Sequence, residues 1–232
     1  IVEKCKSSIF GTKGDINFLY NKGNNQWKFE SPSALMNIGI MTSVVTLDAD
    51  KDGYKDLMIA GKWMDLTLLV NKKGSFMESI PQRIPNSAGL WNVLVATDID
   101  DDKDMDIFCG NVGLNTFYQP NMKMMVDDFD KNGSVEQIIC YVDQDKYYPV
   151  HDIDEMFSQM PYLKKKYLSY ASFANADINM LFTEPFVKNA TTFTLQELRS
   201  CLLINDNGNF HLKSLPDEIQ YSSVYTIIPN KN

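Results

Sequence analysis

Three short acidic stretches with one shared pattern are the feature of this 232-residue chain that most constrains its fold. They occupy residues 48–56, 98–106 and 128–136. Each has Asp at positions 1 and 3, Asp or Asn at position 5, and Asp or Glu at position 9. Strand-like apolar runs flank each stretch, for example residues 44–47 before the first and 57–60 after it. The pattern predicts three β-hairpins with acidic tips.

A second hairpin pattern repeats in step with the acidic one. It consists of an apolar strand, an Asn/Gly turn and an aromatic residue expected to point inward, which is Trp27, Phe76 or Phe210. Asn21 precedes Asp48 by 27 residues and Asn71 precedes Asp98 by 27, so the whole unit repeats every 50 residues (98 − 48). Four strands in about 50 residues is the size of a β-propeller blade.

The same spacing predicts where the repeat is interrupted. The third acidic loop begins 30 residues after the second (128 − 98), which is 20 fewer than the repeat of 50. Asn205 lies 77 residues after Asp128, whereas Asn71 lies 23 after Asp48, which leaves an insertion of 54 residues. We therefore expect one repeat domain over residues 1–232, with units at about 1–47 (partial), 48–97, 98–127 (shortened) and 128–232 (with an insertion at about 143–197).

The insertion is predicted to be helical. Two residue pairs in or next to it have capping-box spacing, namely Asp152 with Glu155 and Thr194 with Glu197. Apolar residues recur at helical spacing between residues 157 and 181, and Pro161 is expected to start a second helix. The Lys run at 164–166 is interpreted as a solvated face, with a docking patch as the alternative.

The residue types in the acidic loops point to a hard cation. Carboxylate and amide oxygens at positions 1, 3, 5 and 9, with the position 7 carbonyl turned inward, suit Ca²⁺. The candidate ligands are Asp48, Asp50, Asp52, Tyr54 and Asp56 in loop one, Asp98, Asp100, Asp102, Asp104 and Asp106 in loop two, and Asp128, Asp130, Asn132, Ser134 and Glu136 in loop three. A solvated Asp/Gly turn is the alternative for any one loop, and three copies in register argue against it.

The loops are not EF-hands, because position 12 is Ile59, Cys109 and Ile139 instead of a bidentate Glu. About three Ca²⁺ sites are expected, with dissociation constants of roughly 10⁻⁴ to 10⁻³ M, the range of extracellular modules. Lys103 occupies the position held by Gly in the other loops, at a cost of about 1–2 kcal/mol if its backbone is left-handed. Loop three, with Asn132 and fewer charges, is expected to bind most weakly.

Net charge narrows the class of partner. Thirty acidic against 22 basic residues give a charge of −8, which opposes binding to nucleic acid. No apolar run approaches the roughly 18 residues needed to cross a bilayer, so no membrane insertion is expected.

The acidic loops resemble the FG-GAP or VCBS repeat, the calcium-loop blade of integrin α-subunit propellers. Residues 56–64, 89–92, 110–115 and 162–171 further resemble the repeat region of bacterial VCBS proteins that often carry an ASPIC/UnbV domain. The resemblance implies an all-β fold of propeller blades with a small helical insertion. It also implies an extracytoplasmic, secreted or cell-surface protein with a binding or scaffolding role. It does not imply an enzyme, and none is expected.

Too few units are present for a typical ring, so we expect a partial or unclosed propeller. Its open sheet edges could support self-association. The leading functional hypothesis is a calcium-stabilised surface that binds a protein or a glycan. The alternative is a carbohydrate-active or other metal-dependent hydrolytic enzyme that uses the acidic loops.

A few single residues could also carry function. Trp63 and Trp91 could form a sugar-stacking platform, but large inward aromatics are also normal in blades, and core positions are favoured. Cys109 and Cys140 are expected to be packed thiols; disulfides are possible but not indicated. His151 and His211 are expected to be structural.

Overall fold

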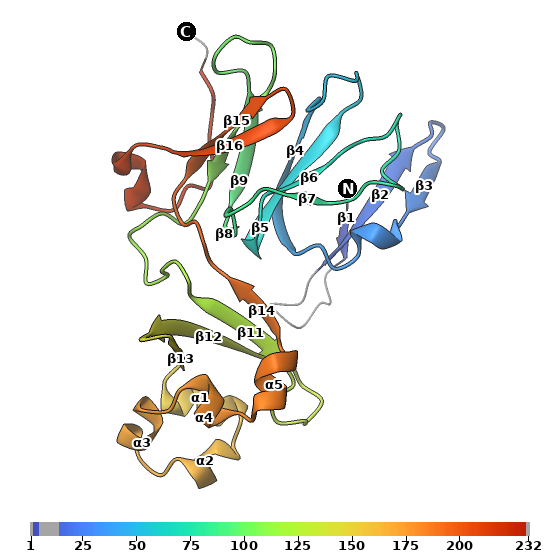
Figure 1. Cartoon of the computed structure of the whole chain (residues 1–232). Coiled ribbons are helices and arrows are strands. Elements are labelled where there is room, and N and C mark those ends of the chain that lie inside the picture. Colours follow the sequence, from blue (N-terminus) through green and yellow to red (C-terminus); the bar gives the residue numbers. More distant parts are fainter. Residues whose placement is uncertain (1, 5–13, 231–232) are drawn as a thin grey trace. The chain divides into compact units, whose positions relative to one another are not determined.

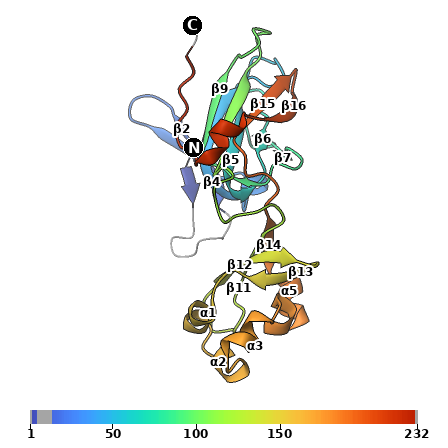
Figure 2. The same cartoon turned by 90° about the vertical axis from the view of Figure 1, so that its left-hand side faces the viewer.

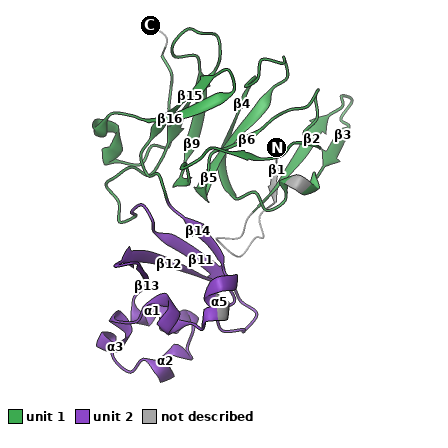
Figure 3. Ribbon diagram, in the orientation of Figure 1, with its two compact units in different colours: residues 1–7, 12–118, 196–232 green, residues 8–11, 119–195 purple. Residues whose placement is uncertain are grey.

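A computed structural model of the chain describes residues 2–4 and 14–230, and Cys5 lies outside them. The chain divides into two compact units (Figure 3): one comprises residues 1–7, 12–118 and 196–232, and the other residues 8–11 and 119–195. The fold is all-β with a small helical part, made of blade-type antiparallel sheets that form no closed barrel in the described residues. The expected fold class, a partial or unclosed propeller, is confirmed.

The first unit contains three antiparallel sheets (Figure 1). Their strand orders are β1-β2-β3, β4-β5-β6-β7 with β8 paired to β5, and β16-β15-β10-β9. The strands are β1 (Val2–Lys4), β2 (Asp15–Asn21), β3 (Trp27–Glu30), β4 (Ile40–Leu47), β5 (Asp56–Met64), β6 (Thr67–Leu69), β7 (Gln82–Arg83), β8 (Gly89–Leu90), β9 (Val93–Thr97), β10 (Asp106–Gly110), β15 (Cys201–Asp206) and β16 (Asn209–Ser214). Two short 3₁₀ helices, η1 (Ser33–Leu35) and η2 (Asp217–Tyr221), also belong to this unit.

The core of the first unit lies on both faces of the β4–β7 sheet. Successive side chains of a strand point to opposite faces, and β5 is buried along nearly its whole length. Leu57 and Ile59 join a cluster with Ile16 and Phe18 of β2. Met58 and Ala60, which point to the opposite face, join a second cluster that includes residues of β9, β10 and β15. The β4–β7 sheet is therefore packed between the other two, as blades are in a propeller.

The second unit is a four-stranded antiparallel sheet with five short helices (Figure 2). Its strand order is β13-β12-β11-β14. The elements are β11 (Lys123–Asp127), β12 (Glu136–Asp143), β13 (Lys146–Pro149), α1 (Ile153–Gln159), α2 (Leu163–Lys166), α3 (Tyr170–Ala174), α4 (Ile178–Leu181), α5 (Glu184–Asn189) and β14 (Thr191–Thr194). Ile138 and Cys140 of β12 share one core cluster with apolar residues of the helices, so the helices cover one face of this sheet.

The strand pairing differs from the expected division into units. Strand β10 pairs with β15, matching Ile107 with Leu203, so the hairpin that begins at Asp98 is completed by the hairpin around Asn205. The inserted segment is accordingly the whole of residues 119–195, and it contains loop three and a sheet of its own. Counting along the chain assigned the Asn205 hairpin to loop three, because spacing alone does not show which earlier strand a returning strand will join.

The helical expectations were right at α1 and wrong at Thr194. Asp152 is the N-cap of α1, where its side chain accepts the Glu155 N–H. Thr194 ends β14 and starts no helix; the Glu197 side chain instead accepts the N–H groups of the next two residues. Pro161 lies two residues before α2, near the expected start.

The position of Trp27 and the hairpin expected after Asn71 also differ from the sequence-based expectation. Trp27 is 56% exposed and does not point inward, whereas Phe76 is buried. Strand β6 pairs with β7 at Gln82–Arg83, so the turn after Asn71 makes only an isolated bridge between Lys72 and Ser75. Within the described residues, none of the helices has the length and apolar character required to cross a bilayer.

Candidate functional site

Loop one joins β4 to β5 and gathers three carboxylates at its tip. One oxygen each of Asp48, Asp50 and Asp52 lie within 4.8 Å of one another. The other side-chain contacts shape the turn: Asp48 Oδ2 accepts the Gly53 N–H at 3.0 Å, and Asp52 Oδ1 accepts the Tyr54 N–H at 2.8 Å. Asp48 Oδ1 is buried and has no hydrogen-bond partner among the described residues.

Loop two repeats this arrangement between β9 and β10. Asp98, Asp100 and Asp102 form the equivalent cluster, with oxygens within 4.8 Å. Asp98 Oδ1 is again buried without a hydrogen-bond partner in the described part of the chain. Desolvation is the largest cause that raises the pKa of Asp100, and the negative charges of Asp102 and Asp106 raise it further. Lys103 has φ +77°, close to the +88° of Gly53, so the expected left-handed backbone at this position is confirmed.

Loop three joins β11 to β12 in the second unit and uses a different third member. Its cluster contains Asp128, Asp130 and Glu136, so the position 9 carboxylate takes part directly. Asp128 Oδ2 accepts the Gly133 N–H at 2.8 Å, as Asp48 does for Gly53. Burial is the main cause that raises the pKa of Glu136.

The position 9 carboxylates of loops one and two lie outside the clusters and close the turns. Asp56 is fully buried, and its two oxygens accept the N–H groups of Ala49 and Asn71 at 2.8 and 2.7 Å. Burial raises the pKa of Asp56 in spite of these two hydrogen bonds. Asp106 likewise accepts N–H groups from Ile99 and from Asn205.

The position 7 residues of all three loops make the same backbone hydrogen bond. Each N–H donates to the position 5 side chain: Tyr54 to Asp52, Asp104 to Asp102, and Ser134 to Asn132. The Asp104 side chain is buried outside the cluster, where it accepts the Asn207 N–H at 3.1 Å. Burial raises its pKa.

Two groups of contacts in the first unit were not predicted from the sequence. The ammonium group of Lys51, in loop one, lies 3.6 Å from Asp104 of loop two and donates to Asn207 at 2.7 Å. The backbone N–H groups of Asn71 and Asn205 each donate to a position 9 carboxylate, and the side-chain oxygen of each accepts a Gly N–H. Both residues begin the repeated Asn/Gly turn, and this shared position was the available signal for the second group of contacts.

The chemistry of these loops fits a hard divalent cation. Carboxylate oxygens are the ligands that Ca²⁺ prefers, and a buried carboxylate oxygen without a hydrogen-bond donor is costly unless a cation or water satisfies it. Asp48 Oδ1 and Asp98 Oδ1 meet this description at the same position of two loops. A cation held there would also offset the mutual repulsion of three neighbouring carboxylates.

The tryptophan and cysteine candidates are core residues, and His151 makes a surface contact. Trp63 and Trp91 are 3% and 0% exposed, which rules out a sugar platform on them and confirms the core interpretation. Cys109 and Cys140 are buried free thiols, and burial raises the pKa of Cys140 to about 12. His151 contacts Glu155 on the surface of α1 at 3.2 Å.

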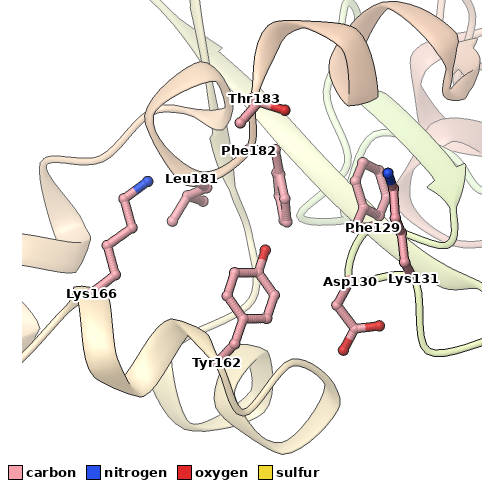
Figure 4. Close-up of a pocket in the computed structure, with 8 residues that line it drawn as sticks. All are labelled: Phe129, Asp130, Lys131, Tyr162, Lys166, Leu181, Phe182 and Thr183. Carbon is pink, nitrogen blue, oxygen red and sulfur yellow. The ribbon is translucent and has the colours of Figure 1, made fainter.

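A cavity of about 400 Å³ lies beside loop three in the second unit (Figure 4). Loop three supplies Phe129, Asp130 and Lys131, and the helical segment supplies Tyr162, Lys166, Leu181, Phe182 and Thr183. Sequence reasoning missed this cavity because 30 residues (132–161) separate Lys131 from Tyr162 along the chain.

Tandem antiparallel sheets with acidic turns between their strands define a repeat protein of the propeller-blade class. Consistent with this class, residues 48–109 match the family model of an FG-GAP-like repeat. The matched stretch contains loops one and two, and it lies wholly in the first unit. No curated protein and no solved structure matches the chain.

Proposed function

We propose that this chain is a calcium-stabilised, extracytoplasmic repeat module that presents a binding or scaffolding surface to a protein or a glycan. The observation that carries the calcium assignment is the pair of buried, unpartnered oxygens at Asp48 and Asp98. They occupy position 1 of two loops within an FG-GAP-like repeat, and such repeats often bind Ca²⁺.

A structural ion explains the placement of the loops better than a catalytic one. Asp56 and Asp106 connect loops one and two to the next hairpin through backbone N–H groups, so ordering a loop also orders that hairpin. At free Ca²⁺ tenfold above the dissociation constant, each site would add about 1.4 kcal/mol to the free energy of unfolding. FG-GAP repeats are typically non-catalytic binding modules, which supports a binding role over hydrolysis.

Calorimetry on chelator-treated protein tests the calcium assignment. Heat of binding for about three Ca²⁺ ions and a Ca²⁺-dependent rise in melting temperature are expected, and loop three should bind most weakly. Asp48→Asn should remove the loop one site. Asp217→Asn, an exposed carboxylate of η2 outside the loops, is the matched control. Absence of both the heat and the rise would refute the proposal.

We also propose that exposed strand edges contribute to partner binding. The edge strands of the first unit's sheets, such as β16, could pair with further blades or with a second copy, because exposed strand edges bind other strands. Light scattering after size exclusion would show concentration-dependent dimers if copies associate. A strictly monomeric particle at high concentration would exclude self-association through these edges.

A further inference from the structure

Two cysteines face each other across the strand pair that completes the interrupted blade. Cys109 of β10 lies directly opposite Cys201 of β15 in the antiparallel register. Directly opposite residues have Cα atoms about 4.5–5.5 Å apart and side chains on the same face of the sheet. A disulfide joins Cα atoms about 4.4–6.8 Å apart, so this register meets the backbone requirement for one.

Both thiols lie in the same apolar environment. Cys109 and Cys201 are fully buried and belong to one core cluster. Each is a free thiol in this structure, and its Sγ donates to the carbonyl two residues earlier, that of Ile107 at 3.5 Å or that of Arg199 at 3.4 Å. A thiol is a weak donor, so oxidation would remove only weak hydrogen bonds and would add no polar group to the core.

The cysteine pair occurs in the blade whose halves are farthest apart along the chain. The equivalent pair in the β4–β7 sheet, three residues after the position 9 carboxylate, is Ile59 opposite Thr67. Two residues (65–66) join those strands, whereas 90 residues (111–200) separate β10 from β15. A cross-link restricts the unfolded chain more when it closes a longer loop. The β10–β15 pair is therefore the position where a disulfide would stabilise a blade most.

Burial determines when the two thiols can react. Desolvation raises the pKa of Cys201 to about 12 and raises the pKa of Cys109 well above its ordinary value. The thiolate is the species that attacks a disulfide, so the folded and reduced protein should oxidise slowly. Before β15 pairs with β10, neither thiol is buried in this way, and each has an ordinary pKa near about 8.5. Oxidation therefore belongs to the stage of folding at which β15 meets β10.

We propose that Cys109 and Cys201 form a structural disulfide that covalently closes the interrupted blade. One thiolate attacks a sulfur of an oxidant disulfide, such as oxidised glutathione or a protein disulfide, and one oxidant thiolate leaves. The second cysteine thiolate then displaces the remaining oxidant sulfur. The cysteine pair loses two electrons, and the oxidant gains them and leaves as two thiols, which take up the two protons. The inference rests on the proposed extracytoplasmic location for its oxidising environment.

Peptide mapping of the full chain, secreted to an oxidising bacterial periplasm, tests the inference. Free thiols are alkylated in denaturant, and the unreduced digest is analysed by mass spectrometry. A peptide pair linked through Cys109 and Cys201 should be present in most molecules. Cys140, which faces Lys123 and Pro149 across its sheet, should be alkylated.

Thermal unfolding supplies a second readout. Reduction with a phosphine should lower the melting temperature of the secreted protein by at least about 5 °C, the size of shift that a typical disulfide causes in a protein of this length. Cys201→Ala should abolish both the linked peptide and the response to reduction. Cys140→Ala, the matched control at another buried cysteine, should retain both.

Three results would overturn the inference: alkylation of both Cys109 and Cys201 in the secreted wild type, a link from either one to another cysteine, or a melting temperature that reduction does not change. The map of the wild type decides the question even if Cys201→Ala does not fold. No readout involves Ca²⁺, so failure of the calcium proposal leaves this inference intact. If the disulfide forms in the periplasm but the protein taken from its own cells carries free thiols, the proposed location is wrong while the pairing stands.

Discussion

The backbone N–H of Asn205 donates to the carboxylate of Asp106 at 2.9 Å, although 99 residues separate them along the chain. Asn71 and Asp56 make the same bond at a separation of 15 residues. The difference, 99 − 15 = 84, is the number of residues added between β10 and β15 relative to the preceding blade. One hydrogen bond therefore identifies the two halves of an interrupted blade.

Replacing Asp106 should affect stability more than cation binding. Asp106→Ala leaves the N–H groups of Ile99 and Asn205 without their acceptor in a buried site. An unsatisfied buried donor costs about 1–3 kcal/mol, so a loss of about 2–4 kcal/mol is expected in urea unfolding. Asp100→Ala, an exposed member of the cluster, should change the stability of the calcium-free protein far less. Equal losses from the two variants would contradict this division of roles.

Lys103→Gly should stabilise the protein. Lys103 holds φ +77°, where an L-residue with a side chain is strained and Gly is not. The gain in the free energy of unfolding should be about 1 kcal/mol, the usual cost of that conformation. Gly53→Ala, at the same position of loop one, is the reciprocal control and should cost a similar amount. A destabilising Lys103→Gly would show that the Lys side chain contributes more than its backbone costs.

Stability should depend on pH through Lys62. Its ammonium donates to the Leu90 carbonyl and to the Asn92 side chain, and burial lowers its pKa below 10.5. Between the lowered pKa and 10.5 the unfolded chain binds more protons at this residue than the folded chain. The Lys62 contribution to stability must therefore rise with pH across that window. The difference in the free energy of unfolding between the wild type and Lys62→Met should rise with pH across this window. A difference that does not change with pH would contradict the prediction.

Removing the second unit should leave the first unit folded. The β10–β15 pairing and the core cluster shared by β5, β9 and β15 lie wholly within the first unit. Replacing residues 119–195 with a short Gly/Ser linker should preserve cooperative unfolding and the Ca²⁺ response of loops one and two, as circular dichroism would show.

A smaller deletion of residues 152–196 is the informative comparison. It removes β14, which pairs with β11, and every helix of the second unit. The remaining strands of that unit should be digested rapidly by protease while the first unit persists. Rapid digestion of the first unit in the larger deletion would show that the two units depend on each other for stability.

Sequence reasoning identified the local elements and missed the long-range pairing. The hairpins around the acidic loops were predictable because alternating apolar residues and turn residues are encoded within about ten neighbouring positions. The partner of β10 was not, because Asn205 follows both loop two and loop three and its turn pattern fits either one. The carboxylates at positions 1 and 3 were found from spacing. The Asp56 carboxylate accepts the backbone N–H of Asn71 from another hairpin, and no local sequence pattern reveals that contact.

The interrupted blade has a consequence for how the chain emerges from the ribosome. Strand β10 ends at Gly110, and its partner β15 begins at Cys201, 91 residues later. At a synthesis rate of about 5–20 residues per second, β10 waits roughly 5–18 s for that partner. All of residues 119–195 is made during this interval, so the inserted unit has time to fold first. Until translation reaches β15, β10 pairs with β9 on one side only, so the half-built blade presents one unpaired strand edge that nascent-chain chaperones would meet.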